Sequence, residues 1–204
     1  MTTIDDAAGR RFLAKDPHFG PIVRAHGPVT AKPKATTGFA ALASIIVHQQ
    51  LAGAAASTIH GRFRAALDRK VTAARVLDTD PEVLRAAGLS RAKLAAITDL
   101  ATKVDDGAVR FAGLSRRSDE AVVEHLVQVR GIGEWSAHMF LMFHLRRPDV
   151  WPVGDLGVRY GWARIHGLAE PLDAKALRDQ ADHLRPWRSI AAWYCWRAME
   201  IRNE

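Results

Sequence analysis

Apolar residues recur along this chain at intervals of three or four positions, which is the spacing of an amphipathic helix. Phe39, Leu42, Ile45 and Ile46, for example, fall on one helical face of a segment that begins near Gly38. Alternating runs of β-branched residues, which would indicate strands, are scarce, whereas alanine and leucine are frequent. The pattern therefore predicts an all-α protein.

Several of the expected helices begin at Ser, Asp or Asp-Pro positions, which suit an N-cap, and some end at glycine or proline. No internal repeat or low-complexity tract interrupts them. The predicted helical segments are Asp6 to Ala14, a short helix after Asp16-Pro17 that Gly27-Pro28 ends, the segment with Phe39 to Ile46, Gly53 to Leu67, Asp80-Pro81 to Gly88, one capped by Ser90, one started by Ser118, Glu134 to Leu145, Asp155 to His166, Asp173 to Leu184 and Pro186 to Arg202.

Two glycines spaced one residue apart, Gly131 and Gly133, lie between two of these amphipathic segments. Glycine has no Cβ, so the backbone N–H groups of such a turn can approach an anion closely, and the helix that follows offers its N-terminus to the same anion. This hairpin is therefore a candidate phosphate clamp. A single carboxylate, Asp155, follows downstream in the sequence Val153-Gly154-Asp155.

Charge and length agree with a folded protein that binds a polyanion. The 204 residues are 48% hydrophobic, which suffices for one folded core of one or two packed subdomains. The 29 lysines and arginines outnumber the 22 aspartates and glutamates, giving a net charge of +7. Such an excess favours nucleic acid as a partner but does not specify it.

Cysteine and histidine usage excludes several kinds of site. With a single cysteine, Cys195, one chain cannot form a disulfide, a cysteine-based zinc site or an iron–sulfur cluster. The nine histidines show no metal-ligand spacing, so we expect no catalytic metal. No apolar run approaches the ~20 residues that span a bilayer, and the N-terminus lacks a signal-peptide pattern. We expect a cytoplasmic protein.

The string Leu126-Val127-Gln128-Val129-Arg130-Gly131-Ile132-Gly133-Glu134-Trp135-Ser136-Ala137, followed by Val153-Gly154-Asp155, resembles the helix-hairpin-helix and Gly/Pro-Asp signature of base-excision DNA glycosylases. It is most similar to the 3-methyladenine DNA glycosylase II branch. A lone Gly-x-Gly would be weak evidence, since many turns contain it, but the whole string is specific. The iron–sulfur branches of this superfamily carry four cysteines, and this chain has one.

The resemblance covers the chain from Asp16-Pro17 to Arg185-Pro186-Trp187-Arg188-Ser189 and implies one helical core, residues 1–204, with two packed subdomains and an active-site cleft between them. The expected subdomains are residues 38–145, which contain the hairpin at 126–137, and residues 1–37 with 146–204. The typical bacterial enzyme has an additional N-terminal β domain. Too few residues precede Gly38 to hold one, so we expect no N-terminal β domain here.

In this family an aspartate at the position of Asp155 serves the chemistry. Cleavage of a base from deoxyribose builds positive charge on the sugar, which an ionised carboxylate stabilises. Asp155 also suits the N-cap of a helix, and an arbitrary aspartate there would more often be only a cap. Both roles can hold at once, because a helix N-terminus favours the anion.

The resemblance also assigns residues to the base pocket. Lyase-competent members carry a lysine where this chain has Trp135, and an indole cannot attack as an amine, so it implies a monofunctional glycosylase. Trp135 would line the pocket edge, and Trp196 would stack on the flipped base, attracting a cationic purine. Met139 stands where the best-known member has a tyrosine, which leaves the substrate range open. Taken alone, Trp135 is explained as well by core packing as by a pocket. Trp193 and Trp196 lie three residues apart on a helix, and one of them could simply belong to the core.

Base flipping needs a side chain that fills the gap left in the DNA stack. The run His48-Gln49-Gln50-Leu51-Ala52-Gly53 resembles the family loop that supplies this plug, which would be Gln50 or Leu51. Without the resemblance, a polar helix end with a buried leucine would be the better interpretation.

For the hairpin, the expected phosphate contacts are the amides of Gly131, Gly133 and Trp135, with Arg130 as an outer contact. The family also implies a structural Na⁺ or K⁺ on the backbone carbonyls of Val127, Val129 and Ile132. No other cofactor is expected.

The predicted function is that of a monomeric, monofunctional DNA glycosylase that binds double-stranded DNA and excises alkylated bases such as 3-methyladenine and 7-methylguanine. Excision of ethenoadenine or hypoxanthine is not readable from the sequence. One alternative is a non-catalytic DNA-binding module that uses the hairpin only to hold phosphates, in which case a carboxylate at Asp155 would bring no advantage. A second alternative is a glycosylase/lyase for oxidised bases, against which Trp135 argues.

Overall fold

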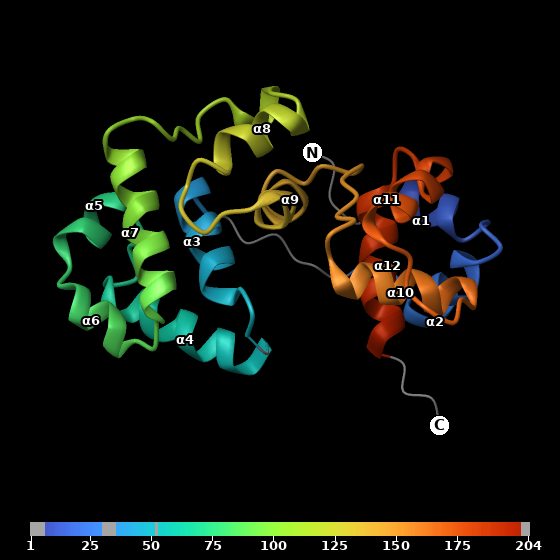
Figure 1. The fold of residues 1–204 in the computed structure, drawn as a ribbon, viewed down its shortest axis with the longest axis horizontal. Helices are drawn as coiled ribbons and strands as arrows, with labels where there is room; N and C mark the ends of the chain where they lie inside the picture. Colours follow the sequence, from blue (N-terminus) through green and yellow to red (C-terminus); the bar gives the residue numbers. More distant parts are fainter. Residues whose placement is uncertain (1–6, 30–35, 52, 201–204) are drawn as a thin grey trace. The chain divides into compact units, whose positions relative to one another are not determined.

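A computed structural model describes residues 7–29, 36–51 and 53–200, and every regular element in these ranges is helical (Figure 1). The prediction of an all-α protein is confirmed. The helices are α1 (Ala7–Leu13), α2 (Phe19–His26), α3 (Gly38–His48), α4 (Gly53–Ala66), α5 (Ala73–Asp78), α6 (Pro81–Ala86), α7 (Arg91–Asp105), α8 (Asp119–Leu126), α9 (Glu134–Phe143), α10 (Leu156–His166), α11 (Ala174–Gln180) and α12 (Arg188–Glu200), with short 3₁₀ turns at Leu114–Arg116 and Asp182–Leu184.

The chain divides into two compact units. The central unit is Lys34–Phe140, and the terminal unit combines Met1–Pro33 with Leu141–Glu204. The central unit therefore holds α3 to α8 and most of α9, while the terminal unit holds α1, α2 and α10 to α12.

Local side-chain caps explain where most helices begin. The hydroxyl of Ser90 accepts a hydrogen bond from the Lys93 amide at the start of α7, and that of Ser118 accepts one from the Ala121 amide at the start of α8. Asp173 caps α11 in the same way through the Ala176 amide. A short polar side chain at this position satisfies an N–H group that has no partner within the helix. The predicted starts of these three helices are confirmed.

Two predicted helix ends and one predicted start are wrong, and one helix was missed. The helix predicted from Pro186 to Arg202 begins at Arg188, and Arg202 lies outside the described residues. The helix predicted to reach Leu145 ends at Phe143, because Arg146 takes a left-handed conformation with φ 58° and the chain turns back. The helix predicted to reach Leu184 ends at Gln180 and is followed by a 3₁₀ turn. The missed helix is α5, a six-residue element for which no apolar period could be read.

The core of the central unit is built on α3 and α7, which pack side by side (Figure 1). Leu42 and Ile46 from α3 and Ile97 and Leu100 from α7 are fully buried. The ammonium group of Lys93 on α7 donates a 2.7 Å hydrogen bond to the carbonyl of Val47, one residue before α3 ends. This bond supplies a donor and a positive charge where a helix carries unpaired carbonyls.

In the terminal unit, α10 and α12 pack so closely that only glycine fits at the crossing. A Cβ atom at Gly161 of α10 would overlap the backbone carbonyl of Cys195 on α12, and Gly161 itself is buried. Tyr194 of α12 is fully buried, and its hydroxyl donates a 2.7 Å hydrogen bond to the carbonyl of Gly27 at the end of α2. The position of α12 is therefore set by contacts with both α10 and α2.

The first turn of α12 also holds the loop that leads to Asp155. The buried hydroxyl of Ser189 donates to the carbonyl of Arg147 at 2.7 Å and accepts from the amide of Val150 at 2.9 Å. The guanidinium of Arg188 binds both carboxylate oxygens of Asp149, at 2.7 and 2.9 Å. A paired arginine of this kind both orients the carboxylate and satisfies it. The chain thus enters α10 from a braced loop.

No helix in the described part of the chain combines the length and the apolar character that crossing a bilayer requires.

Candidate functional site

The predicted hairpin is present in the central unit, between the end of α8 at Leu126 and the start of α9 at Glu134. Gly131 has φ 75°, a conformation that favours glycine, and the Ile132 amide donates to the Val129 carbonyl at 3.0 Å to close the turn. A Cβ at Gly133 would meet no atom within 4 Å. The space beside the first amides of α9 is therefore open, as the approach of a phosphate requires.

Asp99 of α7 holds the hairpin from one side, a contact that the sequence did not indicate. One of its carboxylate oxygens accepts the Arg130 amide at 2.7 Å, and the Lys103 ammonium binds both oxygens at 2.7 Å. Burial opposes ionisation of Asp99, but the hydrogen bonds from Lys103 and from the Arg130 amide together lower its pKa. Asp99 is thus a charged anchor whose negative charge Lys103 offsets.

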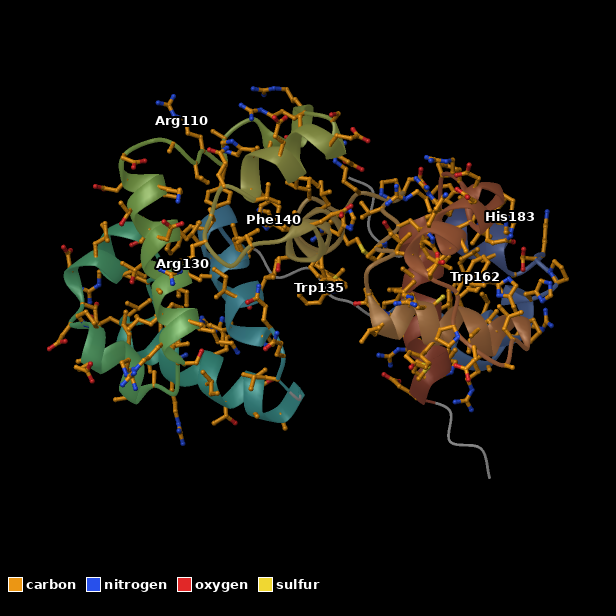
Figure 2. All side chains as sticks on the ribbon, viewed as in Figure 1. Arg110, Arg130, Trp135, Phe140, Trp162 and His183 are labelled. Carbon is orange, nitrogen blue, oxygen red and sulfur yellow. The ribbon has the colours of Figure 1, made fainter. Side chains whose placement is uncertain are left out.

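A shallow groove of about 500 Å³ lies along α7 at this point. Figure 2 shows Arg130 at the hairpin beside α7. Two arginines and two threonine hydroxyls face the groove, a composition that suits phosphate oxygens. Its lining residues are Arg91, Leu94, Ala95, Thr98, Asp99, Thr102 and Arg130.

The two candidates for the plug lie just beyond the end of α3. Gln50 is exposed and has φ 54°, in the left-handed region, and Leu51 is 37% exposed. The neighbouring Gln49 turns the other way and hydrogen-bonds to the hairpin. The leucine is thus not a buried core residue, and nothing in the sequence distinguished Gln49 from Gln50.

Asp155 lies in the terminal unit at the N-cap of α10, as predicted. Its Oδ1 accepts the backbone amide of Val158 at 2.8 Å and the indole N–H of Trp196 at 2.9 Å. Both hydrogen bonds end on the same carboxylate oxygen, and together they limit the rotation of the side chain. The arrangement presents an oriented anion at a helix N-terminus, which can stabilise positive charge or align a water molecule.

Trp196 reaches Asp155 because Gly157 leaves room for it. A Cβ at Gly157 would lie 2.8 Å from Cδ1 of Trp196, closer than such contacts occur, and 3.1 Å from Oδ1 of Asp155, which is tighter than most. The Trp196 ring also stacks on Phe143, with 5.9 Å between the ring centres. The hydrogen bond to Asp155 and the neighbour Phe143 were both missed from sequence, where Trp196 was considered only as a surface for the base.

Cys195 is fully buried beside this site. Burial and the negative charge of Asp155 both raise the pKa of its thiol well above the ordinary value. The thiol therefore stays protonated at neutral pH and is not a nucleophile.

Trp135 and Met139, the other predicted pocket residues, lie one turn apart on α9 in the central unit. Trp135 is 37% exposed in the first turn of the helix (Figure 2), whereas Met139 is buried. The structure therefore brings Asp155 and Trp196 together within one unit, and Trp135 and Met139 together within the other.

The carbonyl groups of Val127, Val129 and Ile132 all belong to the turn between α8 and α9. The Val127 residue is 40% exposed, while Val129 and Ile132 are buried. Within the described ranges, no group of three or more His, Cys, Asp or Glu side chains is placed to hold a metal ion.

A family model described as "HhH-GPD superfamily base excision DNA repair protein" matches residues 43–186. The chain belongs to the HhH-GPD superfamily. The matched region contains the hairpin, its anchor Asp99 and the capping Asp155. The match ends before Trp196, so the family model does not include this residue. The hydrogen bond between the Trp196 indole and Asp155 is seen in the structure.

Several similar proteins within the HhH-GPD superfamily carry 3-methyladenine DNA glycosylase names. DNA-3-methyladenine glycosylase 1 of Schizosaccharomyces pombe is 31% identical over 161 residues, which cover 78% of this chain and 71% of that protein. A solved structure of the S. pombe 3-methyladenine DNA glycosylase in complex with abasic DNA matches with a TM-score of 0.85 and 28% identity, over 96% of this chain and 98% of that one. The solved structure of a DNA-3-methyladenine glycosidase from Bacillus halodurans matches with a TM-score of 0.80 and 31% identity, over 97% of this chain and 91% of that one.

Proposed function

We propose that this protein is a monofunctional DNA glycosylase that removes alkylated bases of the 3-methyladenine and 7-methylguanine type from double-stranded DNA. It hydrolyses the N-glycosidic bond and leaves an abasic site. Relatives named DNA-3-methyladenine glycosylase support the substrate class. The single observation that carries the chemistry is the Asp155 carboxylate, held at the start of α10 by the Val158 amide and the Trp196 indole.

The reaction needs a stabilised positive charge at C1′ of the sugar. As the bond to the base breaks, its electron pair leaves with the base, and a cationic alkylated base departs as a neutral molecule. The Asp155 carboxylate stabilises the oxocarbenium-like sugar and orients the water that attacks C1′. That water supplies the new hydroxyl group and loses one proton. Since the leaving group is already activated, a general acid at the base contributes little.

The central unit holds the DNA. The amides of Gly131, Gly133 and Trp135 bind a backbone phosphate at the N-terminus of α9, and Arg130 adds an outer contact. Gln50 or Leu51 fills the gap in the stack after the base is flipped. In the terminal unit, the electron-rich indole of Trp196 beside Asp155 attracts the positive charge of the flipped base. In the central unit, Trp135 and Met139 are the residues that the family resemblance assigns to base binding.

The cation implied for this family would be bound at the hairpin by the backbone carbonyls of Val127, Val129 and Ile132. Carbonyl oxygens in a turn are suitable donors for Na⁺ or K⁺. The ion would be structural and would hold the hairpin in its phosphate-binding form. We further propose that the enzyme needs no catalytic metal or iron–sulfur cluster, acts as a monomer and works in the cytoplasm.

The direct test is single-turnover release of 7-methylguanine or 3-methyladenine from a duplex that carries one lesion. Release by the wild-type protein, leaving an abasic site, is the expected result. Tight binding of the lesion duplex without release of either base would instead support a non-catalytic DNA-binding module.

Trapping with borohydride tests the monofunctional character. We expect no covalent protein–DNA complex when the enzyme acts on lesion duplex in the presence of borohydride, because Trp135 cannot form the Schiff base that borohydride reduces. A bifunctional glycosylase assayed in parallel is the positive control. A trapped complex of this protein would contradict the proposal and favour a glycosylase/lyase.

Substitution of Trp196 by phenylalanine tests the orientation of Asp155. The change keeps an aromatic ring for the base but removes the N–H donor, and a hydrogen bond to a charged group contributes enough to slow base release about 10- to 100-fold. Affinity for a duplex with an abasic analogue should stay near the wild-type value.

Trp193→Phe is the matched control, since it is the same change at a buried tryptophan of the same helix. The Trp193 ring packs against Arg197, whose Cζ lies 4.9 Å from the ring centre. A Trp196→Phe enzyme with wild-type single-turnover rates would show that the indole N–H does not assist Asp155.

A further inference from the structure

Gln49 occupies the junction between α3 and the plug segment, which is here defined as Gln50 and Leu51. Its backbone amide closes α3 by donating to the carbonyls of Ile45 and Ile46, at 3.1 and 3.3 Å. Its side chain reaches across to the hairpin, 82 residues further along the chain. Gln49 is therefore covalently part of one DNA-binding element and hydrogen-bonded to the other.

Both hydrogens of the Gln49 side-chain amide are used on the hairpin. The nitrogen donates to the carbonyl of Gly131 at 3.0 Å and to the hydroxyl of Ser136 at 2.9 Å. Gly131 lies in the turn itself, and Ser136, which is 2% exposed, lies in the first turn of α9. These two acceptors flank the amides of Gly133 and Trp135, so Gln49 spans the phosphate-binding segment.

The surroundings make this bridge rigid. On the hairpin side, the carboxylate of Asp99 holds the Arg130 amide at 2.7 Å. On the α3 side, Lys93 holds the carbonyl of Val47 at 2.7 Å, two residues before Gln49. With both ends anchored to α7, a shift of the hairpin is transmitted to Gln49 through its two hydrogen bonds rather than absorbed by a loose helix end.

The plug segment follows directly. Gln50 is held in a left-handed conformation with φ 54°, and Leu51 is 37% exposed. A phosphate bound at the hairpin fixes the position of the DNA strand. The plug segment must then enter the base stack of the DNA at a set distance from that phosphate. The Gln49 bridge joins the hairpin to the residue that directly precedes the plug.

We propose that Gln49 is a positioning residue that couples phosphate binding by the hairpin to insertion of the plug segment into the DNA stack. The role of the plug in this coupling rests on the proposed function. Gln49 itself need not touch DNA, since both of its donors are already engaged by Gly131 and Ser136.

The test is a double-mutant cycle on the full chain with Gln49→Ala and Leu51→Ala. The probes are a duplex with one tetrahydrofuran abasic analogue and the matching undamaged duplex. Gln49→Ala should weaken binding of the abasic duplex about 10-fold, since two hydrogen bonds are lost. Leu51→Ala should weaken binding of the abasic duplex in the wild-type background. In the Gln49→Ala background it should change that affinity less than twofold, because a misplaced plug segment contributes little to binding.

Gln180→Ala, the same chemical change at an exposed position in α11, is the matched control and should leave both affinities unchanged. Fluorescence of 2-aminopurine placed opposite the lesion reports the disturbed stack and should fall with Gln49→Ala. Ser136→Ala, which removes one acceptor only, is the second variant if Gln49→Ala unfolds, and it should show the same non-additivity with Leu51→Ala.

Strictly additive effects of the two substitutions, or wild-type binding by Gln49→Ala, would overturn the coupling. The result of the double-mutant cycle is independent of whether the protein releases a base. A wild-type protein that shows the non-additive cycle but releases no alkylated base would overturn the glycosylase proposal alone, and one that releases base with additive effects would overturn the coupling alone.

Discussion

Substitution of Asp155 by asparagine should lower single-turnover release of 7-methylguanine about 10²- to 10³-fold, the usual cost of removing one electrostatic group that stabilises a transition state. The amide keeps the shape of the side chain, and its oxygen can still accept the Val158 amide and the Trp196 indole. Only the negative charge is lost. The measurement is base release under enzyme excess, with affinity for the abasic-analogue duplex determined separately.

Asp173→Asn is the matched control, because Asp173 is also an N-cap aspartate, bound to the Ala176 amide at 2.8 Å. It removes the same charge from a helix start without touching Asp155. Near wild-type release by Asp155→Asn would show that Asp155 is only a cap, and the protein would then fit a DNA-binding module better than an enzyme.

Substitution of Gly161 by alanine should lower the free energy of unfolding by about 3 kcal/mol, the upper part of the range for an overfilled core. The new methyl group would overlap the backbone of Cys195, which cannot rotate away as a side chain can. The α10–α12 pair would have to separate, and the Trp196 indole would move away from Asp155. Base release should therefore fall along with stability.

Urea unfolding followed by circular dichroism measures this effect. Gly61→Ala in α4 is the matched control, because a Cβ there meets nothing within 4 Å and alanine favours a helix. That change should raise stability by roughly 0.5 to 1 kcal/mol. If Gly161→Ala unfolds within 0.5 kcal/mol of wild type, α10 and α12 do not pack as closely as described.

The helix starts could be predicted because each depends on residues three or four positions apart. Ser90, Ser118 and Asp173 cap the helices that were expected to follow them. Helix ends were less predictable. Arg146 turns the chain in a left-handed conformation that no residue type there announces, and α9 ends two residues earlier than its apolar pattern suggested.

The candidate site shows the same division. The hairpin glycines and the carboxylate that follows them were readable, because the requirement for close backbone approach and for a helix N-cap is local. The partners of these groups were not. No sequence motif marks Asp99 or Gly157. Asp99 has a role because it accepts the Arg130 amide, and Gly157 has one because it leaves room for the Trp196 indole.

The sequence by itself thus determined the helical class, the glycine hairpin between α8 and α9, and the placement of Asp155 at the start of α10. Periodicity, glycine geometry and capping each act over a few residues. Only the tertiary structure decided that the Trp196 indole, 41 residues away, binds Asp155, and that Gln49 spans the hairpin 82 residues away. The physical reason is that such hydrogen bonds depend on how packed helices bring distant side chains within about 3 Å, a distance no local rule specifies.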